Sequence, residues 1–187
     1  MTDTQKKPLW KNELVWLFLL TSGLFAILYS KFILGGYAYV FTDTGADTMQ
    51  INYAQYGLFS SLFRSGESGY VLQAGLGMDV SSYYPAYLIP YNLLILLAPQ
   101  RLLPWAVLAS AYLKMITISL VGYLFYRKLM QDGIGTMAAA LAWTFSGYVI
   151  LWGQHYGFCT CMALFTVFMY FLQCYLNGEQ RWKSAGL

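Results

Sequence analysis

The sequence predicts an all-α integral membrane protein with four transmembrane helices, or five in an alternative arrangement, and one large outer loop. Hydrophobic residues make up 58% of the 187 residues and charged residues only 10%, whereas a soluble domain carries about a quarter charged residues. The mean hydropathy is +0.49. From Gly133 to Gly178 there is no Asp, Glu, Lys or Arg, and because a spanning helix needs about 20 apolar residues, this stretch accommodates two.

The first predicted span covers residues 14–33 and follows a cytoplasmic tail, residues 1–13. Lys6, Lys7 and Lys11 precede the apolar run Leu14–Ser30, and this run lacks a small-residue cleavage site. The run is therefore expected to be a signal anchor that remains in the mature protein.

An outer loop is predicted over residues 34–101, and it begins with a surface helix over residues 48–64. Ile51, Ala54, Leu58 and Leu62 recur at helical spacing, which indicates an amphipathic helix along the membrane surface with these residues facing lipid or protein. Residues 65–69 form a polar turn, followed by a glycine-rich stretch over residues 75–79.

The run over residues 80–100 has two interpretations. It contains Pro85, Pro90 and Pro99, and because proline removes a helical hydrogen bond, a bent segment that re-enters the membrane is favoured. If the run instead crosses the membrane, the chain has five spans.

Three further spans are predicted over residues 102–126, 135–152 and 158–176. They leave a cytoplasmic loop over 127–134, an outer loop over 153–157 and a cytoplasmic tail over 177–187. The positive-inside rule favours four spans, because this topology places seven Lys and Arg residues inside and three outside. The inner set is Lys6, Lys7, Lys11, Arg127, Lys128, Arg181 and Lys183, and the outer set is Lys31, Arg64 and Arg101.

Half of the chain's eight carboxylates lie in the large outer loop, at Asp43, Asp47, Glu67 and Asp79, so we expect any chemistry to take place there. Asp47 also fits a capping box with Gln50, and Asp43 fits a simple Asx turn. Lys114 falls near the middle of a predicted span, where a charge indicates a functional site unless the side chain snorkels to the interface.

The order of these features resembles a known family. The chain carries Asp47 and Gln55–Tyr56, then Gly75-Leu76-Gly77-Met78-Asp79, Tyr83–Tyr84, Pro90-Tyr91-Asn92-Leu93-Leu94 and the aromatic-rich segment Ala142–Tyr148. This pattern, from about Gly35 to Leu151, resembles the YfhO family of bacterial membrane proteins. Those proteins look like glycosyltransferases of the GT-C class, which take a sugar from a polyprenyl-phosphate carrier and attach it to cell-envelope polymers such as teichoic acids on the outer membrane face.

The resemblance implies an enzyme of the bacterial plasma membrane, of which this chain looks like an N-terminal portion. GT-C enzymes of this type need more spans, so either C-terminal spans or a second membrane polypeptide is expected to complete the fold. The second outer loop offers Gln154, His155 and Tyr156, whereas GT-C relatives often carry an acidic residue there.

Sugar transfer requires a base for the acceptor hydroxyl and positive charge for the phosphate leaving group. We expect Asp47 and then Asp43 to act as the base, and Arg64, Arg101 or Lys114 to contact the phosphate. Gln50, Gln55, Asp79, Tyr83 and Tyr84 are the other expected substrate-binding residues, with the two tyrosines lining a pocket for a sugar or prenyl chain.

No cofactor follows from the sequence, although a divalent cation is compatible with the reaction. His155 is the only histidine, so no zinc cluster can be assembled from the chain alone. The expected partners are membrane lipid and a polyprenyl-phosphate-linked sugar rather than nucleic acid. The competing interpretation is a non-catalytic subunit, either a scaffold or part of a flippase that binds the lipid carrier without chemistry.

Overall fold

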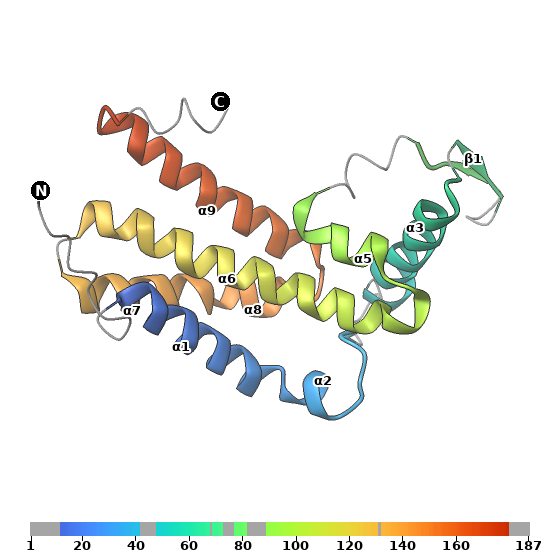
Figure 1. The fold of residues 1–187 in the computed structure, drawn as a ribbon, viewed down its shortest axis with the longest axis horizontal. Coiled ribbons are helices and arrows are strands. Elements are labelled where there is room, and N and C mark those ends of the chain that lie inside the picture. The colour runs from blue at the N-terminus through green and yellow to red at the C-terminus, as the bar shows by residue number, and fades with distance from the viewer. Residues whose placement is uncertain are drawn as a thin grey trace, which may run out of the picture.

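The computed structural model describes residues 12–41, 48–67, 69–72, 77–81, 89–130 and 132–179. Its α-helices are α1 Glu13–Leu28, α2 Ser30–Leu34, α3 Ala54–Ser65, α5 Leu93–Leu97, α6 Leu103–Leu129, α7 Gly133–Thr144, α8 Gly147–Trp152 and α9 Gly157–Leu176 (Figure 1). A π-helix, Thr48–Tyr53, leads into α3, and 3-10 turns occupy Pro90–Asn92 and Gln100–Leu102. Strands β1 Tyr70–Val71 and β2 Met78–Asp79 pair antiparallel.

Three helical segments are long and apolar enough to cross a membrane: Gln100–Leu129, Gly133–Trp152 and Gly157–Leu176. Helix α1 is apolar but has only 16 residues, which gives a length of about 24 Å against a hydrocarbon core of about 30 Å. Helix α2 continues the chain after a break at Tyr29. A fourth crossing by α1 and α2 together remains a prediction.

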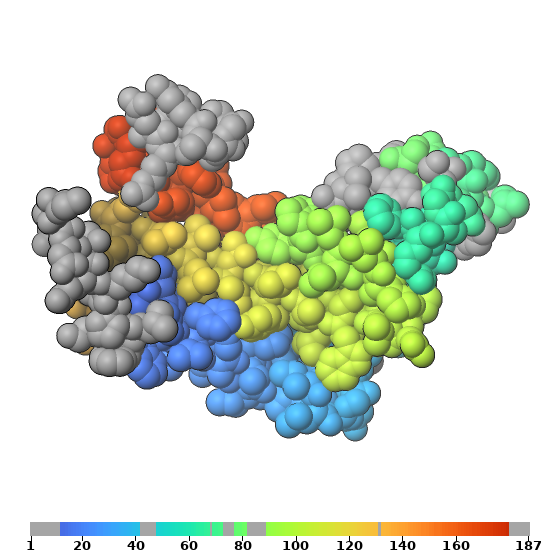
Figure 2. Space-filling view, viewed as in Figure 1, coloured from blue at the N-terminus to red at the C-terminus, as the bar shows by residue number. Residues whose placement is uncertain are grey.

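Helix α6 lies at the centre of the bundle. Figure 2 shows α1 and α2 covering one side of it, while α9 lies against another side. Small hydroxyl groups join the helices in the interior: Thr21 of α1 bonds Ser119 of α6 at 2.7 Å, and the indole Nε1 of Trp143 in α7 donates to Thr166 of α9 at 3.0 Å. Such contacts are typical of helices packed in lipid, where apolar burial between helices gives little driving force.

Charged groups stabilise the helix ends at the end of the bundle far from α3. Asp132 caps α7 by accepting from the backbone N–H groups of Ile134 and Gly135, as expected for a helix N-terminus. Glu13 accepts a hydrogen bond from the Tyr123 hydroxyl, so α1 is tied to α6. Lys128 and Glu179 form an ion pair at 2.5 Å that ties the chain after α9 to α6.

Several predicted boundaries are corrected. The helix of the first predicted span, 14–33, is broken at Tyr29. The helix of the span predicted over 102–126 continues to Leu129, and its last turn contains Arg127 and Lys128. The loop predicted over 127–134 is therefore much shorter. The span 135–152 is interrupted between Thr144 and Gly147, and its two parts are α7 and α8.

The region predicted as the large outer loop contains a small separate core. Helix α3 packs on α5 and on the β-hairpin through Phe59, Leu62, Val71, Val80 and Leu96. The buried Ser60 hydroxyl donates to the Ala98 carbonyl at 2.7 Å. Gly77 has φ +108° and lies beneath the Tyr70 ring, where any Cβ would collide, so glycine is required at this position.

The predicted helix over 48–64 is present, but its predicted apolar face is wrong in part. Ile51 and Ala54 are exposed, whereas Tyr56, Phe59 and Ser60 are buried with Leu62. The helix is oriented by its contacts with α5 and the π-helical turn rather than by its aliphatic residues alone. Whether it lies along a membrane surface remains a prediction.

Within the run over residues 80–100, residues 82–88 lie outside the described residues. The described part after them contains a 3-10 turn, the five-residue helix α5 and a second 3-10 turn. Pro90 occupies the first position of the first turn and Pro99 precedes the second, which is where proline is tolerated. No helix long enough to cross a membrane occurs in residues 89–99.

Candidate functional site

The segments predicted as the two outer loops meet beside the first half of α6. The Thr48 hydroxyl donates to the Gln154 carbonyl at 3.3 Å, and the Tyr156 hydroxyl donates to the Tyr39 carbonyl at 2.5 Å. Residues before and after the segment 42–47 are thus both joined to the short loop Gly153–Tyr156. This convergence places the outer loop beside the interior of the bundle.

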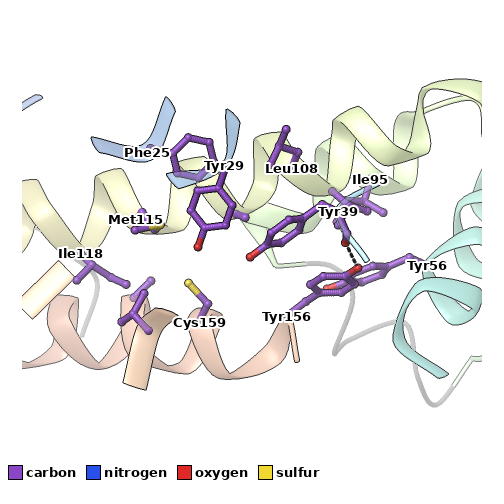
Figure 3. Packing of buried hydrophobic residues seen from close by; sticks show 14 of the residues in the cluster. Phe25, Tyr29, Tyr39, Tyr56, Ile95, Leu108, Met115, Ile118, Tyr156 and Cys159 are labelled. Atoms are coloured by element: carbon purple, nitrogen blue, oxygen red, sulfur yellow. Dashed lines mark hydrogen bonds between the residues drawn. The ribbon is translucent and has the colours of Figure 1, made fainter. Parts of the chain in front are cut away.

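Where these segments meet, the rings of Tyr39, Tyr56 and Tyr156 form a tyrosine wall (Figure 3). The Tyr156 ring stacks between Tyr56, at 5.4 Å between ring centroids, and Tyr39, at 5.8 Å. Tyr29 packs edge-on against Tyr39 at 5.3 Å. Tyr56 also donates to the side-chain oxygen of Asn92 at 3.4 Å. These aromatic contacts fix the ring positions.

Lys114 lies behind this wall and is only 2% exposed. Its ammonium group donates to the Tyr156 carbonyl at 3.2 Å, and no ion pair forms with it among the described residues. The side chain is therefore buried within the protein, and its ammonium group is directed towards the loop Gly153–Tyr156. A buried charge without a counter-charge is costly, which is why it marks a candidate site.

A small cavity lies beside Lys114. Tyr29, Tyr39, Tyr56, Ser110, Lys114 and Tyr156 line it together with aliphatic residues and Cys159. The space open to the centre of a water molecule is about 10 Å³, roughly the room that a single water needs. The Ser110 hydroxyl, 1% exposed, has no hydrogen-bond partner within the described part of the chain, although buried hydroxyls nearly always have one.

The tyrosines around the cavity are neutral at physiological pH. Burial, followed by the neighbouring tyrosines, raises the pKa of Tyr156 and of Tyr39 well above the usual value, because desolvation disfavours the phenolate. None of these hydroxyls supplies a negative charge to balance Lys114.

An open groove is lined by residues next to Tyr156 in the chain, among them His155 and Gly157. It has a volume of about 430 Å³ and is lined by Ile51, Asn52, His155, Gly157, Phe158 and Cys161. Phe158 packs edge-on against Trp152, at 5.4 Å, and against His155, at 5.7 Å. The groove has the size of a small-ligand site and combines apolar and aromatic surface with an amide and an imidazole.

The two predicted bases and the aromatic pair lie outside the described residues: Asp43, Asp47, Tyr83 and Tyr84. Their flanking residues Phe41 and Thr48 are described, and Phe41 packs against the cluster that contains Tyr39 and Tyr156.

The structure separates the predicted phosphate-binding cations. Arg64 is exposed, and its Nε donates to the Ser60 carbonyl at 3.2 Å. Arg101 is exposed in the turn before α6. Neither lines the cavity or the groove. Lys114 is the cation that the loops surround.

The remaining predicted substrate-binding residues do not line the cavity or the groove. Gln50 is exposed on the π-helix, and Gln55 is half-buried at the start of α3. Asp79 is exposed on β2, where it accepts from the Ser81 hydroxyl at 2.6 Å and from the Ser81 backbone N–H at 3.0 Å. These hydrogen bonds lower the pKa of Asp79.

Sequence reasoning missed Ser110, Tyr39, Tyr156 and the groove residues. Ser110 precedes Lys114 by four residues, so the two share a helix face, and this spacing was a usable signal. The tyrosines gave no signal, because aromatic residues at span ends are common in membrane proteins. No group of three metal-ligating side chains occurs in the part of the chain that the structure describes.

Comparison of the chain with protein-family models, with curated proteins and with solved structures found no match.

Proposed function

We propose that this end of the bundle binds a polyprenyl-phosphate-linked sugar and takes part in transferring the sugar to a cell-envelope polymer at the outer face of the bacterial plasma membrane. The observation that carries the proposal is Lys114, a buried ammonium group that has no ion pair among the described residues and that lies beside the segments predicted as the two outer loops. A phosphodiester or phosphate at the membrane interface is a ligand that such a charge recognises.

The groove lined by His155 and Gly157 is a suitable binding site for the sugar. Its volume of about 430 Å³ exceeds what one sugar ring requires and falls within the range of small-ligand sites. Phe158 offers an apolar ring face, and Asn52 and His155 offer polar atoms. Since the groove and the cavity share the chain segment from His155 to Cys161, a phosphate at Lys114 and a sugar in the groove would be neighbours.

The base in the proposed reaction comes from the segment between Phe41 and Thr48, which carries Asp43 and Asp47. The carboxylate accepts the proton of the acceptor hydroxyl as its oxygen bonds to the anomeric carbon. The bond from that carbon to the phosphate oxygen breaks, and the electron pair leaves with the phosphate, whose charge Lys114 stabilises.

Binding of the phosphate requires a movement of the tyrosine wall. The cavity next to Lys114 has room for about one water, which is too little for a phosphate group. Tyr156 lines the cavity, its chain neighbours His155 and Gly157 line the groove, and its ring stacks on two others. The proposal therefore includes displacement of Tyr156 when the carrier binds.

The test is transfer of labelled sugar from polyprenyl phosphate by membranes that contain the chain, with abundance of each variant measured separately. Lys114→Met is expected to lower transfer about 100-fold, the effect of losing one group that stabilises a developing anion. Asp47→Asn tests the base. Lys31→Met is the matched control, because Lys31 is exposed and lies on α2 outside the cavity. Unchanged transfer in Lys114→Met, with control and wild type active, would overturn the proposal.

The non-catalytic alternative is favoured by a different observation. Among the described residues that line the cavity and the groove, none is a carboxylate. A chain that binds the lipid carrier without transfer would retain Lys114-dependent carrier binding in the variants Asp43→Asn and Asp47→Asn, with no turnover in any variant. Loss of turnover in these variants with carrier binding retained would favour the enzyme.

A further inference from the structure

The charge on Lys114 needs a counter-charge that the described residues do not provide. The ammonium group has three donors, and the structure gives it one acceptor, the Tyr156 carbonyl. The neighbouring tyrosines are neutral, and the cavity lining contains no carboxylate among the described residues. Because burying an uncompensated ammonium is costly, an anion bound beside it would stabilise the fold.

A second, independent observation comes from Ser110. Its hydroxyl is 1% exposed, lines the same cavity and finds no hydrogen-bond partner among the residues that the structure describes. It lies one helical turn before Lys114, so both side chains project from one face of α6. Tyr29 and Tyr39 line the same cavity, and Figure 3 shows their hydroxyls pointing into the interior on the side of Cys159. Tyr29 and Tyr39 share a side-chain hydrogen bond, which uses one of their two hydroxyl protons. The Lys114 ammonium, the Ser110 hydroxyl and the other tyrosine hydroxyl are left as donors, which is a suitable environment for an anion.

The size of the cavity limits the ligand. The space of about 10 Å³ takes a single particle about as large as a water molecule. A halide ion is only slightly larger than water, whereas sulfate and phosphate carry four oxygens around a central atom and do not fit without movement of the wall.

We propose that Lys114 and Ser110 hold one halide ion, chloride under physiological conditions, as a resident counter-ion inside the bundle. The ion contacts the Lys114 ammonium and the Ser110 hydroxyl, and Tyr29 or Tyr39 adds a neutral O–H donor. This site does not depend on sugar transfer. In the transfer proposed above, the lipid phosphate replaces the halide when Tyr156 moves.

The test is the thermal unfolding midpoint of the purified full chain in detergent, followed by fluorescence of its six tryptophans. Chloride is titrated against gluconate, which is too large for the cavity, at constant sodium and constant ionic strength. A bound ligand raises the midpoint saturably, by roughly 5–10 °C when chloride exceeds its dissociation constant a hundredfold. Equilibrium binding of radioactive chloride then gives the stoichiometry, expected to be one ion per chain.

Variants separate the site from a general salt effect. Ser110→Ala is expected to weaken chloride binding about tenfold, since it removes one hydrogen bond to a charged ligand, and Lys114→Met is expected to abolish it. Lys31→Met serves as control and should retain the wild-type response. If Lys114→Met does not fold, Ser110→Ala alone still tests the site.

Two outcomes overturn the inference. An equal response to chloride in the wild type and in Ser110→Ala and Lys114→Met would show a non-specific salt effect. No saturable chloride response in the wild type would mean that the cavity holds only water. Neither result bears on sugar transfer, which is measured by a separate assay and can fail or succeed independently.

Discussion

At the scale of single residues, Tyr156 joins three parts of the protein. Its backbone carbonyl accepts from Lys114, its hydroxyl donates to the Tyr39 carbonyl, and its ring stacks on Tyr56 and Tyr39. The contact with Lys114 uses the main chain, so a change of side chain at this position leaves it in place. The side chain therefore mainly holds the outer loop against the bundle.

The variant Tyr156→Phe tests this role. It keeps the ring but leaves the Tyr39 carbonyl without its donor, which we expect to cost about 1 kcal/mol and to lower the unfolding midpoint by roughly 2–4 °C. The measurement is tryptophan fluorescence during heating in detergent. Tyr148→Phe is the control, since Tyr148 is 43% exposed and should be neutral. Equal midpoints for both variants would show that the Tyr156–Tyr39 bond contributes nothing to stability.

The pKa of the Asp79 carboxylate on β2 reports on the local structure of the β1–β2 pair. Hydrogen bonds from the Ser81 hydroxyl and backbone N–H lower its pKa below the ordinary value of 3.8, because they stabilise the charged form. The stabilisation is present above the ordinary pKa and is lost as the pH falls through the lower, folded-state pKa. Ser81→Ala should raise the Asp79 pKa towards 3.8, as followed by carboxyl carbon NMR. A pKa that does not move would show that the hydroxyl is not the main cause.

The sequence predicted the charge in the site but not the groups around it. Lys114 was identifiable because an ionisable residue in an apolar run is rare. Its orientation was not, since a lysine has enough length either to snorkel or to point inward. The wall formed by Tyr39, Tyr56 and Tyr156 depends on three segments far apart in the chain, and periodicity within any one of them carries no information on that contact.

At the scale of elements, α1 is attached to α6 through polar groups in an apolar interior. Thr21 and Ser119 are both fully buried and bond each other at 2.7 Å. Ser22 also bonds the Tyr112 hydroxyl at 2.8 Å. In lipid such bonds contribute roughly 0.6 kcal/mol on average and up to about 1.7 kcal/mol.

A double-mutant cycle on Thr21 and Ser119 measures this attachment. Thr21→Val alone leaves the Ser119 hydroxyl without that partner and should destabilise the protein by about 1 kcal/mol. The double variant Thr21→Val/Ser119→Ala should lose less stability than the two single variants summed, because it leaves no unpaired hydroxyl. Unfolding midpoints in detergent give the coupling. Additive effects would contradict the interhelical hydrogen bond.

The positions of the helices could be predicted from apolar runs, but the break between α7 and α8 could not. Residues from Gly133 to Trp152 read as one uninterrupted apolar stretch, and no proline marks the interruption. The backbone leaves the helix at Phe145 and Ser146. Similarly, the buried face of α3 includes the aromatic residues Tyr56 and Phe59, whereas an aliphatic pattern favoured Ile51 and Ala54. Tertiary contacts with α5 decide that orientation.

At the scale of the whole molecule, the helices alternate in direction. The start of α1, the end of α6, the start of α7 and the end of α9 lie at one end (Figure 1), and α3, the hairpin and the loop Gly153–Tyr156 lie at the other. The first end carries Arg127 and Lys128 in the last turn of α6. Positive charge at this end agrees with a cytoplasmic orientation under the positive-inside rule, and the cavity at Lys114 then lies nearer the outer face.

The four-span topology predicts which engineered thiols react from outside the cell. With Cys161 replaced by alanine, Ser68→Cys should react with a membrane-impermeant maleimide on intact cells, whereas Thr4→Cys and Gln180→Cys should react only after permeabilisation. Five spans would place the thiol of Gln180→Cys outside. If α1 and α2 do not cross the membrane, the thiols of Thr4→Cys and Ser68→Cys would react on the same side. Labelling of Ser68→Cys from the inside alone would place the outer loop in the cytoplasm, where an externally directed sugar transfer could not occur.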